Sequence, residues 1–201
     1  MKIKKLLQYV LIAIPLVVIV VYLMYTKGNL RLKIELGKNK KHYKELIAQG
    51  EKTAFNYHQL GVIYMRQRQY DDALQCLLEA HKIDPTHFDA IFSTAVIYYQ
   101  KSLTDKLNTK KWLALSISNV DKASEYIGKN PFHCSNVAML YERLGEYKKA
   151  LEYHKLAIDL IDNYELPKFM DKKEIEEGKK LYLENYNRLK AKLKNENKDG
   201  E

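Results

Sequence analysis

The stretch over residues 54–87 constrains the fold of this chain more than any other part of its sequence. It contains two runs of regularly spaced residues, which are Tyr57, Leu60, Gly61, Tyr64 and then Ala73, Leu77, Ala80. Spacings of three and four residues place side chains on one face of a helix. The letters "RQRQYD" interrupt the spacing between the two runs, and Pro85 follows the second run. Because proline has no backbone N–H, it marks a helix end. The stretch therefore predicts a pair of antiparallel helices.

The same pattern returns further along the chain. A shift of 34 residues places Ala95 and Tyr98 where Gly61 and Tyr64 stood. The second helix of this unit, with Ser116, Val120 and Ala123, then comes about nine residues late, and the stretch over 101–112 accounts for the delay. From residue 131 the register is restored, with Val137, Ala138, Tyr141, Gly145, Tyr147, Ala150, His154 and Ala157. The periodicity predicts three helical pairs, over 54–87, 88–130 and 131–163.

This order of an aromatic residue, Leu-Gly, Tyr, Ala, a large apolar residue, Ala and Pro resembles the tetratricopeptide repeat. The residues that carry the resemblance are Tyr57, Leu60, Gly61, Tyr64, Ala73, Leu77, Ala80, Pro85, Ala95, Tyr98, Ala123, Ala138, Tyr141, Ala150 and Ala157. The resemblance covers 54–163 and implies an all-α solenoid. End repeats need a polar outer surface, so a long helix within 164–201 is expected to cap the third repeat with its apolar stripe of Ile175, Tyr182, Tyr186, Leu189 and Leu193.

The resemblance also implies where a partner binds. In this family the first helix of each repeat lines a concave face that holds a peptide or a partner helix. Carried over by register, the groove residues are Phe55, His58, Val62, Met65, Asp89, Phe92, Val96, Tyr99, Phe132, Ser135, Met139 and Glu142. This mainly apolar set, which lacks lysine, suits a hydrophobic peptide or an amphipathic helix. The alternative is that the chain fills its own groove, with the region 26–50 or with the inserted stretch that contains Trp112.

The N-terminal part of the chain has a different character. Residues 1–5 form a basic tail, and residues 6–25 contain no charged side chain. Twenty apolar residues in a helix reach about 30 Å, which matches the hydrocarbon thickness of a bilayer. We therefore expect a transmembrane helix at 6–25 and a basic linker with a helix at 26–53. A cleaved signal peptide is the competing interpretation, but the bulky residues and lysine of "VYLMYTKG" do not resemble a cleavage site.

The net charge of +9 comes mainly from the N-terminal quarter of the chain. Residues 1–50 contain ten of the 34 basic residues and two of the 25 acidic ones. The remainder of the chain is nearly neutral, which argues against a nucleic-acid surface and favours attraction of the basic flanks to anionic lipid. Because more basic residues follow the apolar segment than precede it, the repeat domain is expected in the cytosol. The alternative is that the repeat domain lies on the extracytoplasmic side of the membrane.

The sequence shows no arrangement of residues for catalysis. The six histidines lack metal-binding spacing, and neither a phosphate-binding loop nor a nucleophile turn is present. We expect Cys76 and Cys134 to pack as small apolar side chains. Asp71 and Asp72 are expected to stabilise a helix start. The chain is therefore predicted to be a membrane-anchored scaffold without enzymatic activity, cofactor or metal. The alternative is a chaperone-like or import-receptor protein that binds many amphipathic segments.

Overall fold

A computed structural model describes residues 27–164 and 171–196 of the 201-residue chain. The basic tail over 1–5, the predicted membrane helix over 6–25 and the last five residues lie outside these ranges. No helix within the described ranges is both long enough and apolar enough to cross a bilayer.

The chain divides into two compact units, with the boundary between Glu51 and Lys52. In the first unit, residues 27–48 form one helix. The sequence predicted a basic linker and a helix within 26–53, and the structure shows helix over nearly all of this region. The helix ends at Gly50, which has a φ of 98°, and the backbone N–H of Glu51 reaches back to the carbonyl of Leu46 over 3.0 Å. A glycine in the left-handed region is a common end for a helix.

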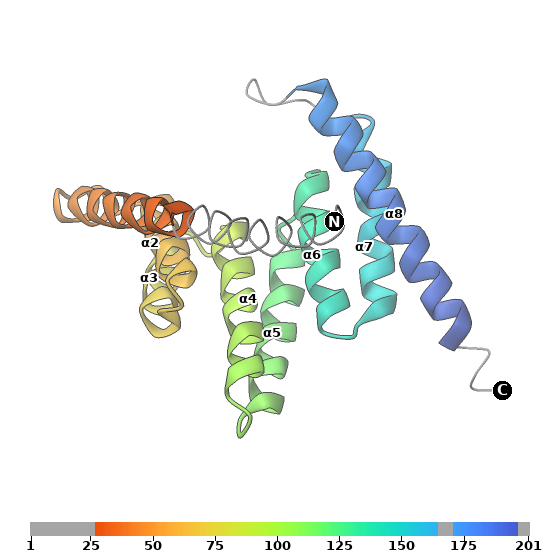
Figure 1. Ribbon diagram of the computed structural model, residues 1–201, viewed down its shortest axis with the longest axis horizontal. Coiled ribbons are helices and arrows are strands. Elements are labelled where there is room, and N and C mark those ends of the chain that lie inside the picture. The colour runs from red at the N-terminus through yellow and green to blue at the C-terminus, as the bar shows by residue number, and fades with distance from the viewer. Residues whose placement is uncertain (1–26, 165–170, 197–201) are drawn as a thin grey trace, which may run out of the picture. The chain divides into compact units, whose positions relative to one another are not determined.

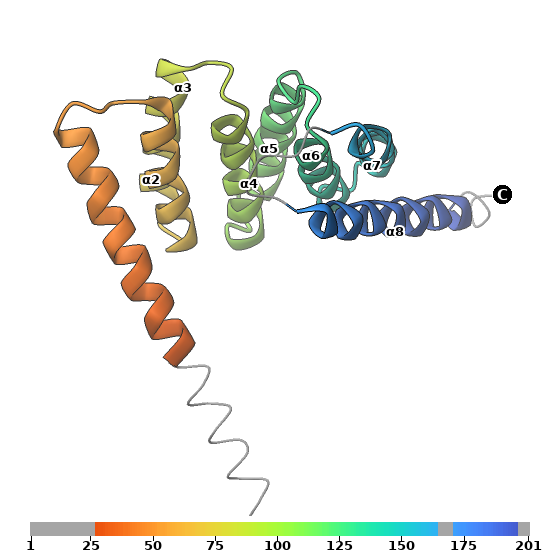
Figure 2. The same ribbon diagram turned by 90° about the horizontal axis from the view of Figure 1, so that it is seen from above.

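The second unit contains three helical pairs followed by one long helix (Figure 1). The pairs are α2 (Ala54–Arg66) with α3 (Tyr70–Ile83), α4 (Phe88–Thr104) with α5 (Thr109–Ser124), and α6 (Pro131–Arg143) with α7 (Tyr147–Ile161). Figure 2 shows α2, α4 and α6 along one side of the array and α3, α5 and α7 along the other. The first helix of every pair therefore faces the same side.

Side-chain hydrogen bonds cap the first helix of each pair. The Thr53 hydroxyl accepts a hydrogen bond from the N–H of Asn56, and the Asn130 side chain accepts from Phe132 and His133. Such caps satisfy N–H groups that have no partner within the helix. Asp71 and Asp72 lie in the first turn of α3, the position predicted from the sequence. Carboxylates in a first turn complement the helix dipole.

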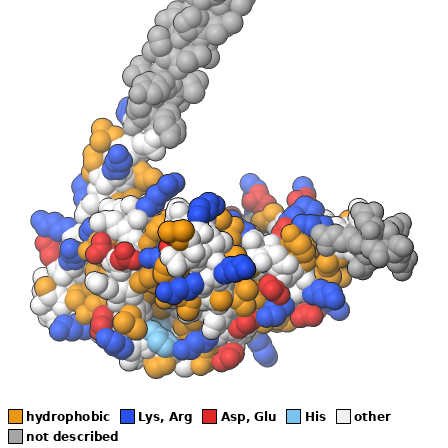
Figure 3. Space-filling model, turned by 90° about the horizontal axis from the view of Figure 1, so that it is seen from below, with side chains coloured by type: hydrophobic (Ala, Val, Ile, Leu, Met, Phe, Trp, Pro, Cys, Tyr) orange, Lys and Arg blue, Asp and Glu red, His pale blue; other side chains and the backbone are white. Residues whose placement is uncertain are grey.

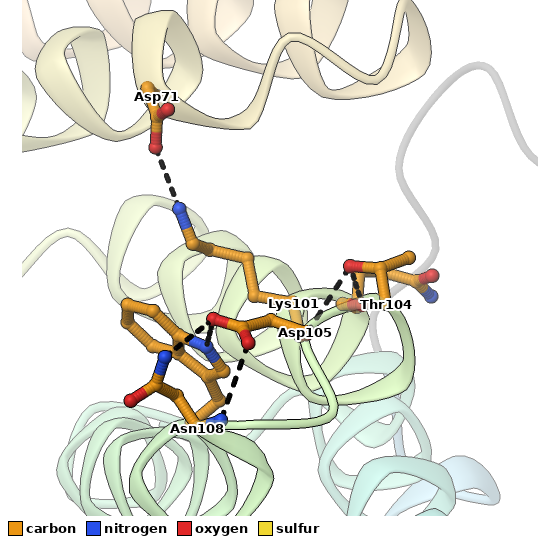
Figure 4. Close-up of polar contacts among 7 residues, drawn as sticks. Asp71, Lys101, Thr104, Asp105 and Asn108 are labelled. Atoms are coloured by element: carbon orange, nitrogen blue, oxygen red, sulfur yellow. Dashed lines mark hydrogen bonds and ion pairs between the residues drawn. The ribbon is translucent and has the colours of Figure 1, made fainter.

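The second helix of the middle pair begins later in the sequence than the repeat predicts because the inserted residues lengthen both helices of the pair. They do not form a long loop. α4 has 17 residues and α5 has 16, joined by a turn over 105–108. Asp105 organises this turn, because its carboxylate accepts hydrogen bonds from Trp112 Nε1 and from Asn108 Nδ2, both over 2.9 Å (Figure 4). Lys101, one turn before the end of α4, pairs with Asp71 of α3 over 2.7 Å. The insertion thus extends the middle hairpin and links it to the first.

Most residues that carried the repeat resemblance lie in the core. The small residues Ala73, Ala80, Ala95, Ala123, Ala138, Ala150 and Ala157 are fully or almost fully buried, whereas Tyr57, Tyr64 and Tyr98 are half-buried and Pro85 is exposed in the turn after α3. Gly61 shows why small residues are needed, because a Cβ built on it would lie 3.1 Å from the Leu77 side chain. Two helices cross closely at this point.

A partly exposed polar network joins the second and third hairpins. Asp121 Oδ1 on α5 accepts a hydrogen bond from the Tyr141 hydroxyl of α6 over 2.6 Å and one from Lys149 Nζ of α7 over 2.7 Å. Burial opposes the charge on Asp121, but these two hydrogen bonds hold the pKa of its carboxyl below the usual value. The network therefore ties three helices together through one carboxylate.

The long helix α8 (Lys172–Glu196) packs against α7. Reciprocal hydrogen bonds between Asp171 and Glu174 form a capping box at its start. Tyr182 and Leu189, from the stripe predicted to cap the third repeat, are 3% and 0% exposed. Figure 2 shows α8 on the side of the array formed by the first helices, where Tyr182 of α8 contacts Phe132 of α6.

Candidate functional site

We call the twelve predicted groove residues on α2, α4 and α6 the groove face. The structure leaves three of them exposed, namely Phe55, Asp89 and Met139. Phe55 is 54% exposed, the largest value among the apolar side chains of the groove face. Two are buried, His58 and Ser135. The other seven are half-buried, which are Val62, Met65, Phe92, Val96, Tyr99, Phe132 and Glu142.

His58 differs from the expectation that it faces a partner. Only 8% of this residue is exposed, and its Nε2 lies 3.3 Å from the Ser93 hydroxyl on α4. Its ring also lies 5.4 Å from that of His87, the residue that caps α4. Burial lowers the pKa of His58, with the charge of Asp89 opposing. His58 therefore joins the first two hairpins and is closed to a partner.

Asp89 lies at the start of α4, next to the third hairpin. Its Oδ1 lies 3.8 Å from His133 Nε2, and the His133 ring stacks on Phe88 with centroids 3.9 Å apart. Burial lowers the pKa of His133, and Asp89 raises it to a smaller extent. The Asp89 side chain is 52% exposed. It therefore offers a carboxylate at the rim of the groove face.

α8 covers the groove face at the third hairpin. The ring of Tyr182 meets that of Phe132 edge-on, with centroids 6.5 Å apart. Burial raises the pKa of Tyr182 to about 12, offset in part by a hydrogen bond from Ser135. Arg188 donates two hydrogen bonds, of 2.6 and 2.8 Å, to Glu142. Three of the four groove residues on α6 therefore contact the chain's own C-terminal helix.

The inserted stretch does not occupy the groove face. Trp112 stacks on Tyr98 of its own hairpin with centroids 5.9 Å apart, and the Lys101 ammonium lies 4.9 Å from the centre of its ring. The alternative in which Trp112 of the inserted stretch fills the groove is therefore wrong. A segment of the chain does cover groove residues, but that segment is α8.

The sequence interpretation missed a cavity on the opposite side of α4. It has a volume of about 340 Å³ and opens between α3, α4 and α5. Its lining combines apolar side chains such as Leu74, Leu78 and Ile91 with the polar groups of His81 and Lys122. Lys122 Nζ lies 3.0 Å from His81 Nε2. Repeat periodicity did not reveal this pair. His81 comes directly after the signature residue Ala80, and Lys122 comes directly before Ala123, so neither is a signature position. The two side chains meet only because the first two repeats pack together.

The surface of the repeat unit carries both signs of charge. Figure 3 shows Lys and Arg side chains interspersed with Asp and Glu and separated by hydrophobic side chains. The described residues include no group of three or more His, Cys, Asp or Glu side chains that could hold a metal ion. Cys134 is buried and Cys76 half-buried, and neither forms a disulfide.

Two segments match tetratricopeptide repeat family models, over residues 54–87 and 134–168. Both segments are therefore similar to tetratricopeptide repeats, a family whose members typically bind protein partners and lack enzymatic activity. The photosystem I assembly protein Ycf3 of Prochlorococcus marinus (strain MIT 9215) is 30% identical to this chain over 106 residues. The match covers 50% of this chain, and the chain spans 55% of that protein's length.

The comparison with solved structures matched MamA proteins with TM-scores below 0.5. One crystal structure of MamA is 16% identical, matches 84% of this chain and 94% of its own, and has a TM-score of 0.48. The MamA fragment from Desulfovibrio magneticus RS-1 is 14% identical over 78% of this chain and 84% of its own, also with a TM-score of 0.48.

Proposed function

We propose that this chain is a membrane-anchored scaffold that holds an apolar or amphipathic helix of a partner protein against the groove face of α2 and α4. The observation that carries the proposal is the exposure of Phe55, 54%, at the head of a row of half-buried apolar side chains on these two helices. Helix-in-groove recognition uses such rows, with apolar anchors spaced by three and four residues.

The position of α8 supports the choice of α2 and α4. Phe132, Ser135 and Glu142 on α6 already have partners on α8, whereas the groove residues on α2 and α4 have none on it among the described contacts. A partner helix on the first two hairpins would continue the surface that α8 begins. Val62, Val96 and Tyr99 would contact its apolar face, and Asp89 would pair with a basic residue at its edge.

Affinity capture tests this function. The full chain in mild detergent, immobilised, should retain a discrete protein from a lysate, and the paired change Val62→Glu with Val96→Glu should abolish retention. Phe55→Glu, at an exposed position, tests the same surface without disturbing the core. Leu156→Glu on α7, where the side chain is 39% exposed, is the matched control and should retain the protein. Retention of the same protein by both groove variants would refute the proposal.

The similarity to an assembly protein favours a role in holding one subunit of a larger complex during its assembly. A chaperone-like or import-receptor protein would instead bind many unrelated amphipathic segments. Synthetic helical peptides distinguish the two functions. A scaffold should bind one sequence at least about tenfold more tightly than its shuffled versions, whereas a general receptor should bind them all within about threefold.

The membrane anchor and its orientation complete the proposal. Residues 6–25 would span the bilayer, the basic flanks would contact anionic lipid, and the repeat unit would face the cytosol. Protease added to intact cells tests the orientation. A repeat unit in the cytosol should stay intact until the membrane is permeabilised, and digestion from outside would place it on the other side.

A further inference from the structure

The cavity between α3, α4 and α5 lies on the opposite side of α4 from the groove face and makes no contact with α8 among the described residues. The cavity has a volume of about 340 Å³ and is lined by residues of α3, α4 and α5. Figures 1 and 2 show α4 between α3 and α5 in this part of the array. This volume is within the range of about 300 to 1,000 Å³ that is typical of binding pockets. Ile91 of α4 contributes to its lining and is 3% exposed. Leu78 also lines it and is 54% exposed, so apolar surface continues outward from the interior.

The polar groups of this cavity are incompletely satisfied. Lysine only donates hydrogen bonds, so the contact of 3.0 Å between Lys122 Nζ and His81 Nε2 requires His81 Nε2 to accept. The proton of a neutral His81 ring is then on Nδ1, which is buried and has no hydrogen-bond partner among the described residues. Burial and the neighbouring charge of Lys122 lower the pKa of His81, which keeps the ring neutral.

Lys122 also lacks a counter-charge. Within the part of the chain that the structure describes, no carboxylate oxygen lies within 4.0 Å of its ammonium, and its one recorded polar partner is His81. The adjacent Asp121 is already occupied by Lys149 and Tyr141. The cavity therefore combines an apolar interior with a half-buried cation that has no anionic partner.

We propose that this cavity is a second docking site, which binds a large apolar side chain of a partner peptide whose adjacent Asp or Glu pairs with Lys122. The apolar side chain would lie against Ile91, Leu74 and Leu78. The carboxylate would replace His81 as the acceptor for the Lys122 ammonium. The site is independent of the groove face, because none of its lining residues belongs to that set.

Peptide selection tests this site. A library of random 12-residue peptides is selected on the full chain in mild detergent, and the affinity of each enriched peptide is measured for the wild type and for variants. One class should contain a Leu, Ile, Met or Phe next to an Asp or Glu. Lys122→Met should weaken this class about tenfold, which is the effect of losing a partly buried charge pair. Leu78→Glu, at an exposed position that tolerates the change, should weaken it as strongly.

Two further measurements separate this site from the groove face and from misfolding. Lys155→Met, at an exposed lysine of α7, and the paired change Val62→Glu with Val96→Glu should each leave the affinity within about twofold of wild type. Lys122→Glu should bind the peptide whose acidic residue is replaced by lysine more tightly than the wild type does. The proposal fails if no acidic-apolar class is enriched, or if that class binds Lys122→Met as tightly as wild type.

Discussion

The guanidinium of Arg188 on α8 donates two hydrogen bonds to the carboxylate of Glu142 on α6, over 2.6 and 2.8 Å. Two parallel bonds of this kind fix the orientation of both groups. Glu142 is a residue of the groove face, so this pair fastens the C-terminal helix across the last part of the surface that we propose for partner binding. It divides the groove face into a covered part on α6 and an accessible part on α2 and α4.

The pair makes a small contribution to stability that depends on pH. Hydrogen bonds from Arg188 hold the pKa of Glu142 below its usual value, against the opposing effect of burial. Stability from this pair is therefore present above the ordinary glutamate pKa of about 4.3 and is lost as the pH falls through the depressed value. Because 56% of the Arg188 side chain is exposed, Arg188→Met should cost less than about 1 kcal/mol at pH 7. Urea unfolding of the wild type and of Arg188→Met should show that the loss in free energy of unfolding becomes smaller below pH 5. A loss that does not change with pH would contradict a stabilising pair between Arg188 and ionised Glu142. Lys194→Met on the same helix serves as the control.

His154 should destabilise the fold relative to leucine. The residue is fully buried on α7, and neither of its ring nitrogens has a hydrogen-bond partner among the described residues. In the first repeat the equivalent position holds Leu77. An unpaired buried polar group costs about 1 to 3 kcal/mol, so His154→Leu should raise the free energy of unfolding at pH 7 by about 1 to 2 kcal/mol. Chemical denaturation measures this change, and a lower stability of the variant would mean that the imidazole has a stabilising partner.

The same substitution should also flatten the dependence of stability on pH. Burial lowers the pKa of His154 from its ordinary value of 6.5, so below pH 6.5 the unfolded chain binds more protons than the folded one. Stability therefore falls as the pH drops from 7 toward 5, and His154→Leu should reduce this fall. The pKa values of His58, His81 and His133 are lowered too, so part of the fall should remain. His42→Leu, at an exposed site, provides the comparison.

Arg68 should be replaceable by glycine with a gain in stability. It is the one non-glycine residue with positive φ in the described ranges, at 59°, and it lies in the turn between α2 and α3. The equivalent position between α6 and α7 holds Gly145, with a φ of 83°. The left-handed conformation costs about 1 kcal/mol or more for a residue with a Cβ. Arg68→Gly should therefore raise the midpoint of thermal unfolding and Gly145→Ala should lower it. Calorimetry measures both midpoints. A lower midpoint for Arg68→Gly and a higher one for Gly145→Ala would show that the left-handed conformation does not strain these turns.

The two cysteines should differ in reactivity. Cys134 is fully buried, and burial raises the pKa of its thiol to about 11, whereas Cys76 is half-buried on α3. The thiolate is the nucleophile, so iodoacetamide at pH 8 should modify Cys76 at least about tenfold faster than Cys134 in the folded chain. Mass spectrometry of the peptides measures both rates. Equal rates in urea would provide the control, and equal rates in the folded chain would contradict the packing of Cys134.

The fold was predictable from the sequence because the repeat signature consists of local spacings. Ala73 and Ala80 are completely buried where the periodicity placed small residues, and Tyr182 and Leu189 are buried on α8, as the C-terminal stripe predicted. Inserted residues follow no period. Their extension of α4 and α5 into longer helices depends on contacts such as that between Asp105 and Trp112, which spacing does not encode.

The candidate sites were predictable only in part. The register identifies which residues share the groove face, but it contains no information on what covers them. Ser135 is buried because α8 crosses α6, and His58 is buried because it meets Ser93 on the next repeat. The contact between His81 and Lys122 likewise joins residues 41 positions apart. Such relations arise from the packing of one repeat on the next.

Photo-crosslinking from the groove face tests the central claim most directly. The full chain is produced with p-benzoylphenylalanine at position 55, 92 or 156, mixed with the captured partner and irradiated. Phe55 and Phe92 belong to the groove face, and Leu156 lies on α7 and is 39% exposed. Our account predicts partner adducts from positions 55 and 92 and none from position 156. Adducts from position 156 with none from positions 55 and 92 would contradict binding at the groove face.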